Sequence, residues 1–203
     1  MRSNDHGVVL LAAGASTRLG QPKQLLDYRG KSLLRHAIDL ATEIGAKPIV
    51  TVLGAHANQL ISEAEQQGVT VLINNDWKEG MASSIRHGLT GLLQINPGVP
   101  AVIFMVCDQP FVTIDVLQNL LDEYTSTGKP MIACKYDGSI GTPALFDKTT
   151  FASLLQLKGD AGAKSILKAR PDLVSTVRFP GGNIDIDTLA DYENLVAENW
   201  QER

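Results

Sequence analysis

The sequence of 203 residues has few cysteines, few aromatic side chains, no long apolar run and no excess of positive charge. Lysine and arginine number 18 against 22 aspartate and glutamate residues, giving a net charge of −4, which argues against a basic nucleic-acid footprint. Aromatic residues make up only 5% of the chain, so platforms for stacking single-stranded bases are not expected. No apolar run reaches the roughly 18 residues that a membrane span requires. We therefore expect neither a nucleic-acid partner nor a membrane partner.

The two cysteines, Cys107 and Cys134, lie in apolar runs and form no C-x-x-C pair or zinc-finger spacing. We expect two buried free thiols, as a reducing cytosol allows. The N-terminal residues 1–7 are short and polar, and the apolar run at 8–13 that follows is too short for a signal peptide. A cytoplasmic protein is the expectation.

Short apolar runs alternate with amphipathic segments over the first two thirds of the chain. The apolar runs predict strands buried on both faces of a parallel sheet, at residues 8–13, 48–53, 69–73, 101–107 and 130–136. Helical spacing is found between them, at residues 32–44, 81–95 and 113–124. Thr113 is the expected N-cap of the last of these helices. The order predicts a three-layer α/β/α sandwich with right-handed crossovers and a mostly parallel central sheet.

The elements become shorter after Asp137. A candidate strand at residues 141–146 contains Pro143, which favours an edge strand or a bulge. The other expected elements are a loop at 159–162, a short helix ending at Pro171, strands at 173–179 and 184–187, and a final helix from a Thr188 cap to about Asn199. No linker or repeat divides the chain, so we expect one domain over residues 1–203.

The loop after the first strand, residues 14–23, combines two glycines with two cations. Ligands of open α/β sheets bind beyond the carboxyl ends of the strands. The glycines let backbone N–H groups approach an anion, while Arg18 and Lys23 offer a fork of donors and a point charge that suit a polyphosphate. The spacing is not a Walker A loop, and Ser16 rules out Gly-x-Gly-x-x-Gly. A glycine-containing turn with solvated cations is the alternative.

Three carboxylates could meet near the first loop. Asp108 directly follows the fourth strand, so it is expected to face the first loop. Asp185 and Asp187 lie two residues apart and would share one face of an extended segment, where they could join Asp108 around a cation. Mg²⁺ commonly takes one or two carboxylates plus phosphate oxygens. The alternatives are that Asp108 is a turn residue or helix cap, and that the later segment is an edge strand whose Asp187 or Thr188 caps the next helix.

The segment at residues 74–86 joins a strand to a helix. Gly80 allows close backbone approach, and Ser83 or Ser84 could cap the helix. Backbone groups and serine hydroxyls could read a base edge here. A plain strand–helix loop with a cap is the alternative.

Residues 11–23 read Leu-Ala-Ala-Gly-Ala-Ser-Thr-Arg-Leu-Gly-Gln-Pro-Lys. They resemble the signature Leu-Ala-Ala-Gly-x-Ser-x-Arg-x-Gly-x-x-Lys of nucleotidyltransferases with the nucleotide-diphospho-sugar transferase fold. The continuation Pro-Lys-Gln-Leu-Leu is similar to the molybdenum-cofactor cytidylyltransferase branch of the MobA-like group. Cys-Asp-Gln-Pro at 107–110, Gly-Met-x-x-Ser-Ile at 80–85 and Asp-Ile-Asp-Thr at 185–188 also match the family, with Leu189 where the family has Pro.

The resemblance implies a Rossmann-like fold and a Mg²⁺- or Mn²⁺-dependent transfer of CMP from CTP to the phosphate of molybdopterin, with release of pyrophosphate. Leu-Ala-Ala-Gly favours CTP, because guanylyltransferases of this group usually read Leu-Ala-Gly-Gly. The nucleotide-binding part would cover about residues 7–112 and the acceptor side about residues 130–190. A molybdoenzyme that accepts the product is the implied protein partner.

The resemblance also assigns site residues. Arg18, Lys23 and Asp108 are the implied catalytic residues, and Asp108 and Asp187 the implied metal ligands. The implied nucleotide-binding residues are Leu11, Ala12, Ala13, Gly14, Ser16, Arg18, Lys23, Gly80, Ser83 and Ser84. The implied acceptor-side residues are Gly141, Asp160, Lys164 and Asp185, with Thr142 and Lys164 standing where relatives have His and Arg.

Other functions fit parts of the same pattern. One is transfer of GMP or another nucleotide to molybdopterin, or to a sugar or polyol phosphate. Another is a non-catalytic domain that binds the molybdenum cofactor and hands it to a partner enzyme. A nicotinamide-dependent oxidoreductase would ordinarily carry the Gly-x-Gly-x-x-Gly loop that is lacking here.

Overall fold

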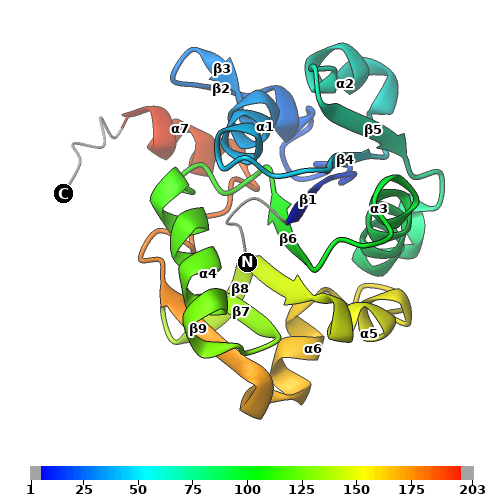
Figure 1. The fold of residues 1–203 in the computed structure, drawn as a ribbon. Coiled ribbons are helices and arrows are strands. Elements are labelled where there is room, and N and C mark those ends of the chain that lie inside the picture. The colour runs from blue at the N-terminus through cyan, green and yellow to red at the C-terminus, as the bar shows by residue number, and fades with distance from the viewer. Residues whose placement is uncertain (1–5, 198–203) are drawn as a thin grey trace.

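The computed structural model describes residues 6–197, in which seven strands form one sheet with helices on both faces (Figure 1). The strand order is β5-β4-β1-β6-β8-β7-β9. Only β8 is antiparallel to its neighbours, so the predicted mostly parallel sheet is confirmed. The strands of this sheet are β1 (Gly7–Ala12), β4 (Ile49–Leu53), β5 (Val69–Ile73), β6 (Ala101–Val106), β7 (Met131–Tyr136), β8 (Ser139–Asp147) and β9 (Val174–Arg178).

Two short strands, β2 (Asp27–Tyr28) and β3 (Lys31–Ser32), form a separate antiparallel ribbon. The helices are α1 (Leu33–Glu43), α2 (Ala57–Ala64), α3 (Met81–Ile95), α4 (Ile114–Thr127), α5 (Phe151–Leu155), α6 (Lys164–Ala169) and α7 (Leu189–Ala197). Short 3-10 turns are η1 (Lys23–Leu25), η2 (Trp77–Glu79), η3 (Lys148–Thr150) and η4 (Pro171–Leu173). Among residues 6–197, no helix has the length and apolar character needed to cross a bilayer.

The helices cover the two faces of the sheet, which confirms the predicted three layers. Helices α1, α2 and α4 pack on one face, and α3, α5 and α6 on the other. Strand β1 shows why its sequence is apolar throughout, since Val8 and Leu10 contact the first layer and Val9 the second. Continuous apolar runs are the sequence pattern of strands buried in this way. Both cysteines are buried free thiols as expected, and burial raises their pKa values to about 12.

The helix caps follow the sequence at three places. The hydroxyl of Ser32 accepts the backbone N–H of Arg35 at 3.0 Å and begins α1. Thr113 caps α4 as predicted, and that helix continues past residue 124 to Thr127. Thr188 and Asp191 form a reciprocal cap at the start of α7, with the Thr188 N–H donating to the Asp191 carboxylate at 2.7 Å. The predicted end of this helix, Asn199, lies outside the described residues.

The prediction of an edge strand at residues 141–146 is wrong. Strand β8 lies between β6 and β7 in the interior of the sheet. The alternative prediction of a bulge is confirmed, because the register shifts where Ala133 pairs with Ala144 and Cys134 pairs with Gly141. The extra residues at this shift are Thr142 and Pro143. A proline lacks the N–H that a regular ladder needs, and a bulge leaves that position unpaired.

The prediction of a strand at residues 184–187 is also wrong. This segment pairs with no strand of the described chain, and one backbone bond ties it to the end of β6, from the Ile186 N–H to the Asp108 carbonyl at 3.0 Å. Ile186 is fully buried in a small cluster beneath the β2–β3 ribbon and α7. The chain is nevertheless anchored so that Asp185 and Asp187 flank this buried side chain.

Candidate functional site

The loop between β1 and η1 is held by a buried glutamine that the sequence analysis did not single out. Gln24 is 1% exposed, and its Nε2 donates to the carbonyl oxygens of Ala12 at 2.9 Å and Gly14 at 3.1 Å. The hydroxyl of Ser16 accepts the backbone N–H of Lys23 at 3.1 Å. These bonds fold the loop back on the end of β1, so Ser16 shapes the loop from within. The sequence marks Gln24 only as part of the Pro-Lys-Gln-Leu-Leu continuation, directly after Lys23.

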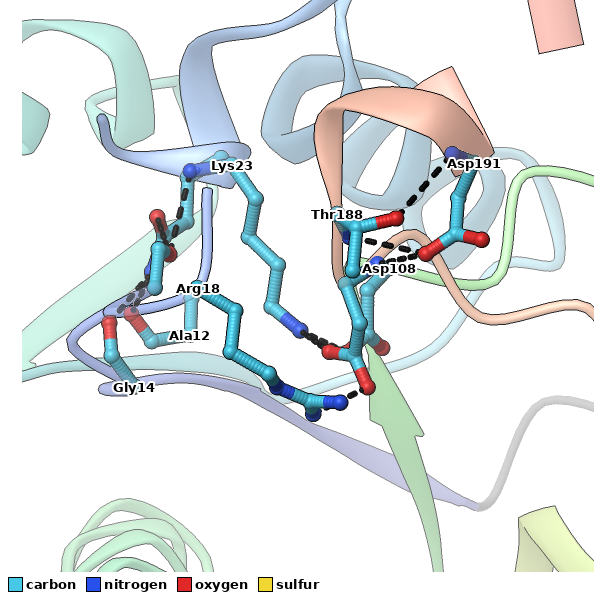
Figure 2. Close-up of polar contacts among 10 residues, drawn as sticks. Ala12, Gly14, Arg18, Lys23, Asp108, Thr188 and Asp191 are labelled. Carbon is cyan, nitrogen blue, oxygen red and sulfur yellow. Dashed lines mark hydrogen bonds and ion pairs between the residues drawn. The ribbon is translucent and has the colours of Figure 1, made fainter. Parts of the chain in front are cut away.

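Two cations and two carboxylates from distant parts of the chain meet beyond the ends of β1 and β6 (Figure 2). The Lys23 ammonium lies 2.5 Å from Asp108 Oδ2 and 2.8 Å from Asp187 Oδ1. The guanidinium of Arg18 donates to the other oxygen of Asp187 at 2.6 Å. The side chain of Lys23 is 15% exposed and that of Arg18 68%, so Lys23 is the inner cation and Arg18 the outer one. The sequence predicts that these four residues come together, and these contacts confirm it.

The pKa values reflect this crowding of charge. Burial alone would lower the pKa of Lys23, but the Asp108 charge and the hydrogen bonds to Asp108 and Asp187 raise it above its ordinary value. The hydrogen bond from Lys23 is the main cause that lowers the pKa of Asp187, and Arg18 adds to the effect. Burial and the charges of Asp108 and Asp187 raise the pKa of Asp185 to about 6. Three carboxylates thus influence one another near two cations, and negative charge is in local excess.

A cavity of about 430 Å³ opens beside this cluster. The predicted nucleotide-binding residues that line it are Leu11, Ala12, Ala13, Gly14, Lys23, Gly80 and Ser84. Trp77, Met81 and Asp108 complete much of the remaining wall. The lining does not include the other three predicted nucleotide-binding residues, Ser16, Arg18 and Ser83. The cavity therefore joins the first loop to the start of α3.

The structure places Asp160 on this first cavity rather than with the other predicted acceptor residues. The backbone N–H of Ala82 donates to the Gly159 carbonyl at 3.1 Å, which docks the 158–162 loop on the start of α3. Gly80 has a φ of +114°, and a Cβ at this position would lie 2.5 Å from the Gly159 carbonyl oxygen and 2.4 Å from the Asp160 carboxylate. The close approach explains why glycine stands here.

The prediction that Ser83 or Ser84 caps α3 is wrong. The helix begins at Met81 after Gly80, which places both serines in its first turn. The buried amide of Asn74 donates to Ser83 Oγ at 2.9 Å and to Ser84 Oγ at 3.0 Å. Ser83 Oγ also lies 2.9 Å from the Gly80 carbonyl oxygen. The pair therefore ties the end of β5 to α3, and Ser84 alone reaches the cavity.

A second cavity of about 240 Å³ adjoins the first and shares Leu11, Met81 and Val106 with it. Three of the four predicted acceptor-side residues line it, namely Gly141, Lys164 and Asp185. The Lys164 ammonium donates to Ser139 Oγ at 2.6 Å. The two cavities and the charged cluster thus form one continuous site.

The residues fit a divalent cation whose remaining ligands come from a nucleotide. Asp108 and Asp187 converge on a single cation, the Lys23 ammonium, and carboxylate oxygens are the donors that Mg²⁺ and Mn²⁺ prefer. Within residues 6–197, no group of three or more His, Cys, Asp or Glu side chains is arranged to hold a metal by itself. Mg²⁺ is commonly bound through one or two carboxylates plus substrate phosphates, and this site provides that number.

The mostly parallel sheet, the glycine-containing loop after β1 and the carboxylate after β6 together define the Rossmann-like nucleotidyltransferase class. More specifically, residues 8–174 match the MobA-like NTP transferase domain, and the chain belongs to this family.

Similarity to known proteins extends beyond the matched domain. Nicotine blue oxidoreductase of Paenarthrobacter nicotinovorans is 30% identical over 202 residues, which cover 93% of this chain and 95% of the relative. The crystal structure of Rv0371c from Mycobacterium tuberculosis is 30% identical, has a TM-score of 0.84, and covers 97% of this chain and 100% of its own. The structure of its complex with manganese gives 28% identity and a TM-score of 0.79, covering 95% and 98% of the two chains.

Molybdopterin-guanine dinucleotide biosynthesis protein A from Archaeoglobus fulgidus shares the fold at 18% identity, with a TM-score of 0.65 over 93% of this chain and 96% of its own.

Proposed function

We propose that this protein is a divalent-metal-dependent nucleotidyltransferase that transfers CMP from CTP to the terminal phosphate of molybdopterin and releases pyrophosphate. The observation that carries the proposal is the meeting of Arg18, Lys23, Asp108 and Asp187 at the mouth of two adjoining cavities. A reaction between two phosphorylated substrates needs two such cavities and a source of positive charge where they join.

CTP occupies the first cavity in this proposal. Its triphosphate lies along the loop that Gln24 holds, where Lys23 and Arg18 neutralise its charge. Its base lies toward Ala13 and Ser84, where backbone groups and a hydroxyl are available. The Leu-Ala-Ala-Gly sequence at residues 11–14 favours CTP over GTP by its resemblance to the cytidylyltransferase branch.

The acceptor occupies the second cavity, with Lys164 as its cation. An oxygen of the acceptor phosphate attacks the α-phosphorus of CTP, and the bond from that phosphorus to the oxygen bridging it to the β-phosphate breaks. The bonding electrons leave with pyrophosphate, whose charge Arg18 and Lys23 balance. The chain contributes alignment and charge compensation, and no protein nucleophile is required.

Asp108 and Asp187 would hold Mg²⁺ or Mn²⁺, which when bound stabilises negative charge on the reacting phosphate. The manganese complex of the mycobacterial relative supports a divalent ion in this family. Molybdopterin as acceptor is supported by the resemblance of the first loop and by membership of the MobA-like family.

The test is a nucleotide screen on the purified protein. CTP, GTP, UTP and ATP are each supplied with Mg²⁺, with and without molybdopterin, and pyrophosphate is measured. We expect release that depends on the acceptor and is fastest with CTP. A preference for GTP would contradict the cytidylyl assignment. Tight binding of the molybdenum cofactor without nucleotide turnover would instead favour a non-catalytic protein that passes the cofactor to a partner enzyme.

An oxidoreductase is the second candidate, favoured by the 30% identity to nicotine blue oxidoreductase over almost the whole chain. The matching assay measures reduction of nicotine blue with NADH or NADPH as the electron donor. Turnover there, with no pyrophosphate released from any nucleotide, would replace the transferase proposal.

A further inference from the structure

Lys23 stands between the two carboxylates that would hold the metal. Its ammonium lies 2.5 Å from Asp108 Oδ2 and 2.8 Å from Asp187 Oδ1, and its side chain is 15% exposed. The lysine tail reaches this point from η1, which Gln24 fixes to the end of β1. The cation is therefore part of the folded site and not a freely moving surface group.

The two oxygens of Asp187 are both engaged in ion pairs. One faces Lys23 and the other accepts from Arg18 at 2.6 Å. A divalent ion that approaches Asp187 therefore meets the positive charge of Lys23 on one side and of Arg18 on the other. Two like charges at contact distance in a half-buried site repel strongly, so Lys23 and a metal ion cannot share the space between Asp108 and Asp187.

A triphosphate is the chemical group that would draw both cations away. The first cavity is lined by Lys23 itself and by the loop that carries Arg18, so phosphate oxygens placed there offer both side chains a new anionic partner. Removal of the two cations would leave Asp108 and Asp187 as a pair of unneutralised carboxylates. The site would then attract the metal ion that accompanies the nucleotide.

We propose that Lys23 is an internal counter-cation that keeps divalent metal out of the Asp108–Asp187 site until a nucleoside triphosphate binds, so that metal and nucleotide bind as one unit. The inference rests on the proposed function for the identity of the triphosphate. By linkage, each of the two ligands strengthens the binding of the other by the same factor. The protein would thereby avoid loading metal in the absence of substrate.

The test is direct titration of nucleotide-free protein with Mn²⁺, with the free ion followed by electron paramagnetic resonance. Wild type is compared with Lys23→Met, which removes the counter-cation, and Lys23→Arg, which keeps the charge. Lys31→Met is the matched control, because Lys31 forms an exposed ion pair with Asp39 at the same 2.5 Å distance. It removes one positive charge from the chain without touching the site.

We expect Lys23→Met to bind Mn²⁺ at least tenfold more tightly than wild type, whereas Lys23→Arg and Lys31→Met stay close to wild type. Equal or weaker binding by Lys23→Met overturns the inference. If Lys23→Met unfolds in EDTA, Mn²⁺ should restore its circular dichroism spectrum, because the metal replaces the lost cation. Failure to restore the spectrum also overturns the inference.

The same proteins separate this inference from the proposed function. Tighter Mn²⁺ binding by Lys23→Met without turnover of any nucleotide by wild type would support the counter-cation and refute the transferase. CTP turnover by wild type without a gain in Mn²⁺ affinity would refute the counter-cation alone.

Discussion

Replacing Gln24 by methionine should destabilise the fold through the loop that it holds. Methionine has nearly the same shape, so the change removes hydrogen bonds with little change in packed volume. The amide nitrogen of Gln24 donates two, to the carbonyl oxygens of Ala12 at 2.9 Å and Gly14 at 3.1 Å, while the amide oxygen accepts a longer one from Ser16 Oγ at 3.5 Å, and the side chain is 1% exposed. At about 1 kcal/mol for each net bond, the free energy of unfolding should fall by about 2 kcal/mol.

The assay is urea denaturation followed by circular dichroism, with the m-value checked for constancy. Gln118→Met is the control, because Gln118 is exposed and donates to Asp122 on the surface of α4. The control should change stability by less than about 0.5 kcal/mol. A loss below about 0.5 kcal/mol for Gln24→Met as well would refute the claim that this side chain holds the loop.

Three further changes follow from the same geometry. Asp108→Asn should lower kcat/KM for pyrophosphate release by at least about 100-fold, because it removes a carboxylate that would hold the metal ion, while exposed Asp115→Asn leaves it unchanged. Gly80→Ala should lower the unfolding free energy by about 1–3 kcal/mol in urea denaturation, because φ at this position is +114° and the new Cβ would clash with Gly159. Gly98→Ala is the control and should cost little, since a Cβ at Gly98 would lie 3.6 Å from its nearest neighbour, Asn96 Oδ1. Burial lowers the pKa of His36, so the unfolded state binds more protons and the unfolding free energy should fall as the solution is acidified from about pH 7 to pH 5. His36→Gln should flatten this dependence, and an unchanged slope would contradict it.

The sequence predicted the sheet where burial on both faces leaves a continuous apolar run, as in β1 and β6. It did not predict α2, which has only eight residues, or the β2–β3 ribbon, whose strands have two residues each. Elements this short carry too few residues for a periodic signal. The local sequence around Pro143 also could not show that its strand lies in the interior of the sheet, because the bulge that accommodates the proline forms only when β8 pairs with β7.

The candidate site likewise contains residues whose positions the sequence predicts and residues whose positions it does not. The meeting of Lys23 and Asp108 could be predicted, because the loop after β1 and the residue after β6 lie at the same edge of the sheet. The assignment of Asp187 to this site rests on the family resemblance, because its segment forms no strand and is tied to β6 by a backbone bond from Ile186 to Asp108. The position of Asp160 could not be predicted, because it depends on how the 158–162 loop docks on α3 through the backbone bond from Ala82 to Gly159. The role of Gln24 likewise depends on the loop returning to the end of β1.

The reaction proposed for this site is the transfer of a nucleoside monophosphate, with its α-phosphorus, from a nucleoside triphosphate to a phosphorylated acceptor. The most direct measurement supplies CTP labelled with ³²P at the α or at the γ position, with Mg²⁺ and molybdopterin, and follows the label by chromatography. We expect the α-label to become attached to the acceptor and the γ-label to leave as pyrophosphate. Transfer of γ-label to the acceptor, or no transfer of either label, would contradict the proposed reaction.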